Sequence, residues 1–520
     1  MSAQYRRDYL LLAGAAALIS VGALVFYYRQ GAILLYGDAV AHINIARRVF
    51  DSRTPSLLGL GTVWLPLPHL LDIPFIVNDR MWQTGVGASI PSMLAYVAGT
   101  LGIFRLVRGL ASRIAAWIAA AVYALNPNLI YVQATAMTEA LYLAFFIWSA
   151  VFFAEFARSA KEEPERAGRS LTKCGFMVAC AMLVRYDGWF LAAAIAGGAA
   201  VVLWRLPAVG GRLRRALAIF ILLAGATGGA FLVYNWAISG NALEFANGPY
   251  SARAIQERSR TPSMPTYPGE NSPRDAVLQF LKVSRMNVAE GPAEYLLFTL
   301  ALIALLAAIN FARRFLPWSL LWLPAPFYML CVAWGSVPIY HPAWWPFSYY
   351  NVRYGLQLLP AIAVFTALAA EFAARFFPGR AVIGAAAALI AASSSSVWLK
   401  TPICLREAHA NGAQRMALER ALAAEFGRLP ESATFMMDCG AHSGAFQLAG
   451  IPFRRVLRES NPPYWERALT RPAQSADYII AFPGDAVARA VEQFPEGLRL
   501  VATVGTPSQP KAFIYAATHR

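Results

Sequence analysis

The stretch LIYVQATAMTEALYLAFFIWSAVFFA, residues 129–154, decides the fold class because this long apolar run carries a single charged side chain, Glu139. A helix needs about 20 predominantly apolar residues to cross roughly 30 Å of hydrocarbon. Of the 520 residues, 58% are hydrophobic and only 14% are charged, against about a quarter in soluble domains. The mean hydropathy is +0.45. The sequence therefore predicts a polytopic all-α membrane protein.

Windows of similar length and composition recur along the chain, and about eleven of them are predicted to span the membrane. They are residues 9–28, 82–104, 114–126, 129–154, 172–185, 188–204, 217–237, 295–311, 317–336, 356–374 and 382–399.

Basic residues gather in short loops between these spans, which accounts for the net charge of +16. The loops are residues 105–113, 156–173, 204–215 and 311–314. Cytoplasmic loops of membrane proteins are enriched in Lys and Arg. We therefore predict a multi-pass protein of the plasma (inner) membrane, with its N-terminus in the cytoplasm and its C-terminus outside. No nucleic-acid motif accompanies the charge, so no nucleic-acid partner is expected.

Two domains are predicted, a transmembrane domain over residues 1–400 and a small extracytoplasmic α/β domain over residues 401–520. Two outer loops, 36–81 and 239–293, belong to the first. The second has a polar helical pattern followed by four short apolar runs, as βα units do. These runs are ATFMMDC (433–439), ADYIIAF (476–482), RLVATVG (499–505) and AFIYAAT (512–518). The turn DCGAHSG (438–444) lacks a complete phosphate-loop fingerprint, which favours a structural turn.

Two acids lie where the chain meets the membrane boundary, and charges there are functional candidates. Asp38 opens a predicted surface helix over residues 38–50, with His42 one turn later. The alternative for Asp38 is a helix N-cap, a position that Asp favours. Glu139 stands at the outer end of a span, and its alternative is an interfacial side chain without a role.

Two arginines are predicted on the same outer side. Arg185 and Asp187 lie in RYDGWF (185–190), at a turn between two spans, where a mutual structural ion pair is the alternative. Arg353 lies in YYNVRYGLQLLP (349–360), where snorkelling to the interface is the alternative. Acids suit activation of a hydroxyl, and arginines suit bidentate capture of phosphate. Together they predict a lipid-linked phosphate donor and a hydroxyl acceptor.

The chain resembles the GT-C superfamily of integral-membrane glycosyltransferases over roughly residues 5–400. The branch is that of protein O-mannosyltransferases and aminoarabinose transferases, similar to glycosyltransferase family 39, which uses polyprenyl-phosphate sugars. The segments that carry the resemblance are GDAVAH (37–42), RRVFDSRTP (47–55), GTVWLPLPHLL (61–71), NPNLIYVQATAMTEALYLA (126–144), RYDGWF (185–190) and VRYGLQLLP (352–360).

The resemblance implies inverting transfer of a sugar from a dolichyl-phosphate-type donor to a hydroxyl acceptor. It places the general base on Asp38, which His42 would tune, although a histidine of the core or interface is an equal alternative. Protein mannosyltransferases pair Asp with Glu, whereas Ala39 follows Asp38 here, so Glu139 is the candidate second acid. This departure counts against a protein acceptor, and lipid or glycan acceptors stay open.

The donor phosphate is assigned to Arg185 and Arg353, with Asp187 and Tyr354 beside them. No cofactor is required because lipid phosphate is a good leaving group, although Asp38 and Glu139 could share a divalent cation. The rival interpretation is a transporter or flippase of a lipid-linked sugar, but transporters keep their polar site near the bilayer midplane, often within repeats. A structural or receptor membrane protein is a third interpretation.

Overall fold

A computed structural model describes residues 3–206, 210–260, 266–461 and 463–518 of the chain. The contacts divide it into two units. The first unit consists of Met1–Tyr27, Thr62–Pro68 and Pro91–Glu407, and the second of Tyr28–Gly61, His69–Ile90 and Ala408–Arg520. This division differs from the predicted boundary at residue 400, because most of the first predicted outer loop belongs with the C-terminal residues.

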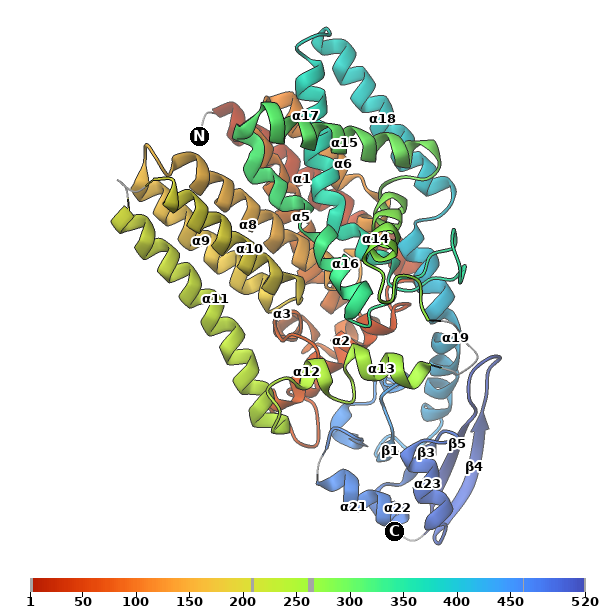
Figure 1. Cartoon of the computed structure of the whole chain (residues 1–520). Coiled ribbons are helices and arrows are strands. Elements are labelled where there is room, and N and C mark those ends of the chain that lie inside the picture. Colours follow the sequence, from red (N-terminus) through yellow and green to blue (C-terminus); the bar gives the residue numbers. More distant parts are fainter. Residues whose placement is uncertain (1–2, 207–209, 261–265, 462, 519–520) are drawn as a thin grey trace. The chain divides into compact units, whose positions relative to one another are not determined.

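The first unit is a bundle of helices. Figure 1 shows α8, α9, α10 and α11 running alongside one another, and α9 packs against each of the other three. Its helices are α1 (Ala3–Arg29), α5 (Val86–Arg108), α6 (Arg113–Ala124), α7 (Pro127–Val132), α8 (Glu139–Ser159), α9 (Pro164–Met182), α10 (Asp187–Trp204), α11 (Gly210–Ser239), α12 (Glu244–Asn247), α13 (Ala252–Ser259), α14 (Pro273–Val288), α15 (Pro292–Phe311), η3 (Arg313–Trp322), α16 (Pro324–Trp334), η4 (Val352–Leu358), α17 (Leu359–Ala373) and α18 (Gly379–Leu399).

Nine helices of the described chain are long and apolar enough to cross a membrane. They include α1, α5, α8 and α10, which match predicted spans. Two of the eleven predicted spans are not among the nine. One is α6, which is only 12 residues long, and the other is α9, whose first turns, PERAGRS, are polar.

The predicted span over residues 129–154 is divided in the structure. Asn126 caps α7 by accepting a hydrogen bond from the Leu129 N–H at 2.9 Å, and α7 ends at Val132. The membrane-spanning helix α8 begins only at Glu139. The carboxylate therefore lies in the first turn of α8, where the helix dipole favours negative charge.

In the second unit, residues from the first predicted outer loop form α2 (Gly37–Arg48), η1 (Leu57–Leu60), α3 (Leu67–Ile76) and α4 (Asp79–Thr84). Three side chains fasten this loop to the C-terminal segment. Asn44 donates to Gln447 Oε1 at 3.1 Å, Gln447 donates to the Trp82 carbonyl at 2.9 Å, and Trp82 donates to Asn44 Oδ1 at 3.0 Å. This closed set of buried hydrogen bonds explains why the loop and the C-terminal segment form one unit.

The C-terminal segment carries a mixed five-stranded sheet in the order β2-β1-β3-β5-β4. β1 pairs in parallel with β2 and β3, whereas β5 is antiparallel to β3 and β4. The four predicted strands are confirmed, and the two-residue β2 was not predicted. Its elements are α19 (Ile403–Phe426), β1 (Phe435–Met437), α20 (Gly444–Ala449), η5 (Phe453–Arg455), β2 (Val456–Leu457), α21 (Tyr464–Thr470), α22 (Pro472–Ser475), β3 (Tyr478–Ala481), α23 (Ala486–Gln493), β4 (Leu498–Val504) and β5 (Ala512–Ala517).

Candidate functional site

Two arginines of the first unit converge on one carboxylate oxygen. Arg185 Nη1 lies 3.1 Å and Arg353 Nε lies 3.2 Å from Glu139 Oε1. Both guanidinium groups also lie over the ring of Tyr354, 4.9 and 5.2 Å from its centroid. Glu139 is fully buried and Arg353 is 8% exposed, so the arginine does not snorkel to a surface. The structure thus brings together residues that are more than 200 positions apart in the sequence.

Arg185 is held by a second set of partners from α10 and α16. It donates to the Tyr328 hydroxyl at 2.9 Å, and that hydroxyl donates to Asp187 Oδ2 at 2.8 Å. Asp187 also lies 3.4 Å from Arg185 Nε. Phe280 of α14 stacks on Tyr328 with ring centroids 4.7 Å apart. The predicted Arg185–Asp187 ion pair therefore exists, as one part of a larger cluster.

Arg353 is positioned by hydrogen bonds to the backbone of Val352, the residue before it in η4. Asn126 and Asn128 both donate to the carbonyl of Asn287, at 2.8 and 3.0 Å. Asn287 in turn donates to the carbonyl of Val352 at 2.7 Å. On the other side, Glu407 accepts from the Val352 N–H at 3.0 Å and lies 3.5 Å from Arg353 Nη1. These buried bonds hold the backbone at Arg353 in one place.

The resulting ion cluster comprises Glu139, Arg185, Asp187, Arg353 and Glu407, which are two guanidinium groups and three carboxylates. One buried oxygen of this cluster, Glu139 Oε2, has no hydrogen-bond partner among the described residues. Leaving a buried carboxylate oxygen unpaired is costly, and such atoms mark places where a ligand or water completes the site. The cluster can therefore accept a hydroxyl donor at Glu139 and present two guanidinium groups to an anion.

Asp38 and His42 lie on α2 of the second unit. The N-cap residue of α2 is Tyr36, whose side chain makes no capping hydrogen bond, so Asp38 is not the N-cap residue. Asp38 instead occupies the first turn, where it is half-buried. His42 is buried, and its Nδ1 lies 2.8 Å from Nε2 of His69, which is fully buried. Burial, with His42 and Arg48 nearby, lowers the pKa of His69 well below its ordinary value.

The structure places five of the seven predicted site residues in one cluster: Glu139, Arg185, Asp187, Arg353 and Tyr354. Asp38 and His42 belong to the other unit. Tyr328, Glu407 and His69 are parts of these two networks that the sequence did not indicate. The signal for Glu407 is a lone acid within the apolar start of α19, and the signal for His69 is an imidazole within the Pro-broken stretch WLPLPHLL. Neither stands out before folding.

Within the residues that the structure describes, no group of three or more His, Cys, Asp or Glu side chains could hold a metal ion. Asp38 and Glu139 lie in different units, so a cation shared between them stays a prediction.

The helices define a class, a polytopic membrane protein with a small C-terminal sheet. Residues 81–233 match the family model described as dolichyl-phosphate-mannose-protein mannosyltransferase. No curated protein sequence matches the chain significantly.

Solved structures share the fold over nearly the whole chain. ArnT from Cupriavidus metallidurans bound to undecaprenyl phosphate is 12% identical, with a TM-score of 0.62 over 99% of this chain and 98% of that one. The apo form of the same protein, also 12% identical, has a TM-score of 0.58 over 97% of this chain and 98% of that one. An oligosaccharyltransferase from Archaeoglobus fulgidus, also 12% identical, has a TM-score of 0.51 over 93% of this chain and 70% of that one. The resemblance predicted from the sequence is confirmed.

Proposed function

We propose that this chain is an inverting glycosyltransferase that moves a sugar from a polyprenyl-phosphate donor to a hydroxyl acceptor on the outer face of the membrane. The observation that carries the proposal is the convergence of Arg185 and Arg353 on Glu139 inside a buried cluster. The fold supports it, since the similar ArnT structure was solved with undecaprenyl phosphate. The match of residues 81–233 to a mannosyltransferase family supports the same class of donor.

In the proposed reaction, the carboxylate of Asp38 accepts the proton of the acceptor hydroxyl. The hydroxyl oxygen forms a bond to the anomeric carbon, the bond from that carbon to the phosphate oxygen breaks, and the lipid phosphate leaves with the electron pair. The phosphate gains negative charge as this bond breaks. Arg185 and Arg353 therefore stabilise the transition state more than the bound donor, which is the condition for acceleration.

Glu139 acts in this proposal as the shared counter-ion of the two arginines. Before the donor binds, it holds both guanidinium groups in place, since each lies within 3.2 Å of its Oε1 atom. Because guanidinium groups have several donors each, they can keep Glu139 while they bind phosphate oxygens. Asp187, Tyr328 and Glu407 orient the arginines from behind.

The test is the substitution Asp38→Asn, which keeps the size of the side chain but cannot accept the proton. Loss of a general base typically slows a reaction about 10²–10⁴-fold. Sugar transfer from a polyprenyl-phosphate donor would be measured with protein reconstituted in nanodiscs. Asp275→Asn is the matched control, because Asp275 also lies in the first turn of a helix, α14. Normal turnover by the Asp38→Asn protein would contradict the proposed base.

A further inference from the structure

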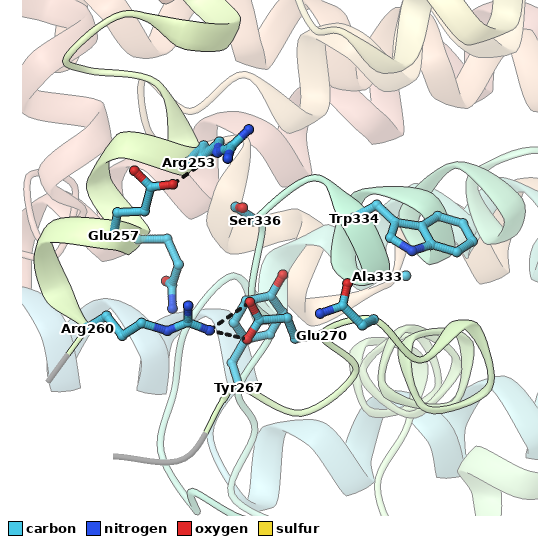
Figure 2. A pocket seen from close by; sticks show the side chains of 10 residues that line it. Arg253, Glu257, Arg260, Tyr267, Glu270, Ala333, Trp334 and Ser336 are labelled. Atoms are coloured by element: carbon cyan, nitrogen blue, oxygen red, sulfur yellow. Dashed lines mark hydrogen bonds and ion pairs between the residues drawn. The ribbon is translucent and has the colours of Figure 1, made fainter. Parts of the chain in front are cut away.

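The first unit has a pocket outside the ion cluster. It has a volume of about 230 Å³, which is roughly that of eight water molecules in the liquid. Figure 2 shows its walls, which are α13 on one side, the segment around Tyr267 and Glu270 below, and the end of α16 on the other. This volume suits one small polar ring, and it is too small for a drug-sized or lipid-sized ligand.

The wall of this pocket is fastened to the last turn of α16. The hydroxyl of the buried Tyr267 donates to the Val332 carbonyl at 2.8 Å, and the Asn271 N–H donates to the Ala333 carbonyl at the same distance. These bonds use carbonyl groups that the end of a helix otherwise leaves unpaired. The pocket is therefore a preformed part of the unit.

The charges that line the pocket are paired with one another. Arg253 Nε lies 3.0 Å from Glu257, and Arg260 Nη2 lies 2.9 Å from both oxygens of Glu270. Figure 2 draws both pairs. Two positive and two negative groups give no net charge, which disfavours phosphate as an occupant. A sugar hydroxyl both donates and accepts, so it can bridge a guanidinium group and a carboxylate.

Uncharged groups complete this lining. The amide of Asn271 and the hydroxyl of Ser336 each offer a donor and an acceptor. Both residues adopt left-handed backbone conformations, with φ of 57° and 56°. Such conformations are uncommon for residues other than glycine and asparagine, and they cluster at functional sites, where the surrounding structure holds them in place. Across the opening, the indole of Trp334 is 59% exposed and offers an amphipathic surface for a sugar ring.

The pocket is joined to the ion cluster through a single helix. Tyr328, which binds Arg185 and Asp187, lies six residues before Trp334 on α16. At 1.5 Å per residue, the two positions are about 9 Å apart along the axis. Trp334 at the pocket and Tyr328 at the ion cluster therefore lie within two turns of each other on the same helix.

We propose that this pocket, lined by Arg253, Arg260, Glu270, Asn271, Trp334 and Ser336, binds one neutral sugar residue of the acceptor. This inference rests on the proposed function, since it adds a carbohydrate acceptor subsite to the donor site. Trp334 also ends a predicted membrane span, and tryptophan is enriched at membrane interfaces. The sugar could belong to a glycolipid or to a soluble glycan, because the recognised chemistry is the same.

Binding can be measured without turnover. The full chain in phosphatidylcholine nanodiscs would be examined by saturation-transfer NMR with the methyl glycosides of glucose, galactose, mannose and N-acetylglucosamine. We expect at least one to bind, and Trp334→Ala to weaken its binding about fivefold through loss of the aromatic contact. Trp236→Ala is the matched control, since Trp236 is 63% exposed on α11 and lies outside the pocket. Equal binding by Trp334→Ala and wild type would overturn the proposal.

Ser336→Gly tests the pocket with a variant that should fold normally, because glycine accepts the left-handed conformation without strain. It should melt no lower than wild type, yet bind the methyl glycoside several-fold more weakly. Displacement of the sugar by inorganic phosphate would also overturn the proposal, since it would identify an anion site. A dialkylglycerol glycoside embedded in the nanodisc distinguishes the sources: tighter binding than the methyl glycoside supports a glycolipid, and equal binding supports a soluble glycan.

Undecaprenyl phosphate, added to the same nanodiscs, separates the two proposals. If it binds while none of the glycosides does, the sugar subsite fails and the proposed function stands. If the glycosides bind but undecaprenyl phosphate does not, the donor site fails.

Discussion

Arg47 of the second unit and Arg353 of the first are both buried. They differ in how completely the charged groups around them find hydrogen-bond partners. In the second unit, Arg47 Nε binds Asp51 at 2.8 Å, its Nη1 donates to the Ile76 carbonyl at 2.8 Å, and its Nη2 binds Asp79 at 2.5 Å. Its guanidinium group also lies 4.6 Å from the centre of the Trp82 ring. Every nitrogen of this group therefore has a partner.

Arg353 of the first unit shares its carboxylate with Arg185, and the second oxygen of that carboxylate lacks a hydrogen-bond partner among the described residues. A fully paired buried charge holds a structure together, and removing one member is strongly destabilising. A cluster with a spare oxygen and shared donors can take up a ligand without losing all its pairs. The two arginines should therefore respond differently to the same substitution.

The largest expected effect is on folding, from Arg47→Ala. The change leaves Asp51 buried with only the more distant and exposed Arg454 and removes a bond to the Ile76 carbonyl. Breaking a buried pair costs about 3 kcal/mol or more of stability. We expect a clearly lower yield and melting temperature in detergent, measured by fluorescence-detected size exclusion after heating. A melting temperature like that of wild type would show that Arg47 does not stabilise the fold.

Arg353→Ala should affect donor binding more than folding. Glu139 keeps Arg185, and Glu407 keeps the Val352 N–H, so neither carboxylate is left alone. Loss of a charge-assisted hydrogen bond costs about 1.5–3 kcal/mol, so undecaprenyl-phosphate affinity should fall roughly 10- to 100-fold. Arg353→Lys should restore only part of it, because an ammonium group cannot reproduce the guanidinium fork. Unchanged affinity in both variants would exclude Arg353 from the donor site.

Glu139→Gln should have a smaller effect in the opposite direction. Glutamine keeps the shape but removes a negative charge that competes with phosphate for both arginines. At a separation of about 7 Å and an effective dielectric constant of about 20, one charge is worth about 2 kcal/mol. Donor affinity should therefore rise by at most about 30-fold, as measured by titration with undecaprenyl phosphate. Weaker binding would show that Glu139 contributes to the donor site by more than its charge.

The smallest expected effect concerns pH and the second unit. Burial, with Arg415 nearby, lowers the pKa of His442 to about 4. Between about pH 6.5 and 4 the unfolded chain binds a proton at this residue and the folded chain does not, so stability falls as the pH falls. His442→Gln should flatten this part of the profile of melting temperature against pH. Parallel profiles for variant and wild type would contradict the assignment.

The sequence predicted the elements whose signals are local. The apolar windows identified α1, α5, α8 and α10, because length and hydropathy are properties of a continuous segment. Short apolar runs likewise identified four of the five strands. The start of α8 was misplaced because the apolar run continues through α7, and only the irregular residues 133–138 separate the two helices. The antiparallel pairing of β5 had no local signal, since strand direction depends on the connections.

The site residues were identified by a different kind of signal. Asp38, Glu139, Arg185 and Arg353 stood out because charges are rare and costly beside an apolar span. Their roles and partners did not follow from that rule. Tyr328 was hidden because a tyrosine in an apolar helix is ordinary, and its hydroxyl bonds to Arg185 and Asp187 exist only after α16 packs beside α10.

Membrane class, the helix carrying Asp38 and the C-terminal strands thus follow from residue order alone, because hydropathy and periodicity act over a few turns of chain. The convergence of Glu139, Arg185, Arg353 and Glu407 was decided by packing. Residues so far apart in sequence meet only where helices bury their apolar faces and leave their charges to pair with one another. The pocket beside Trp334 has the same origin, because its walls come from three segments that share no local pattern.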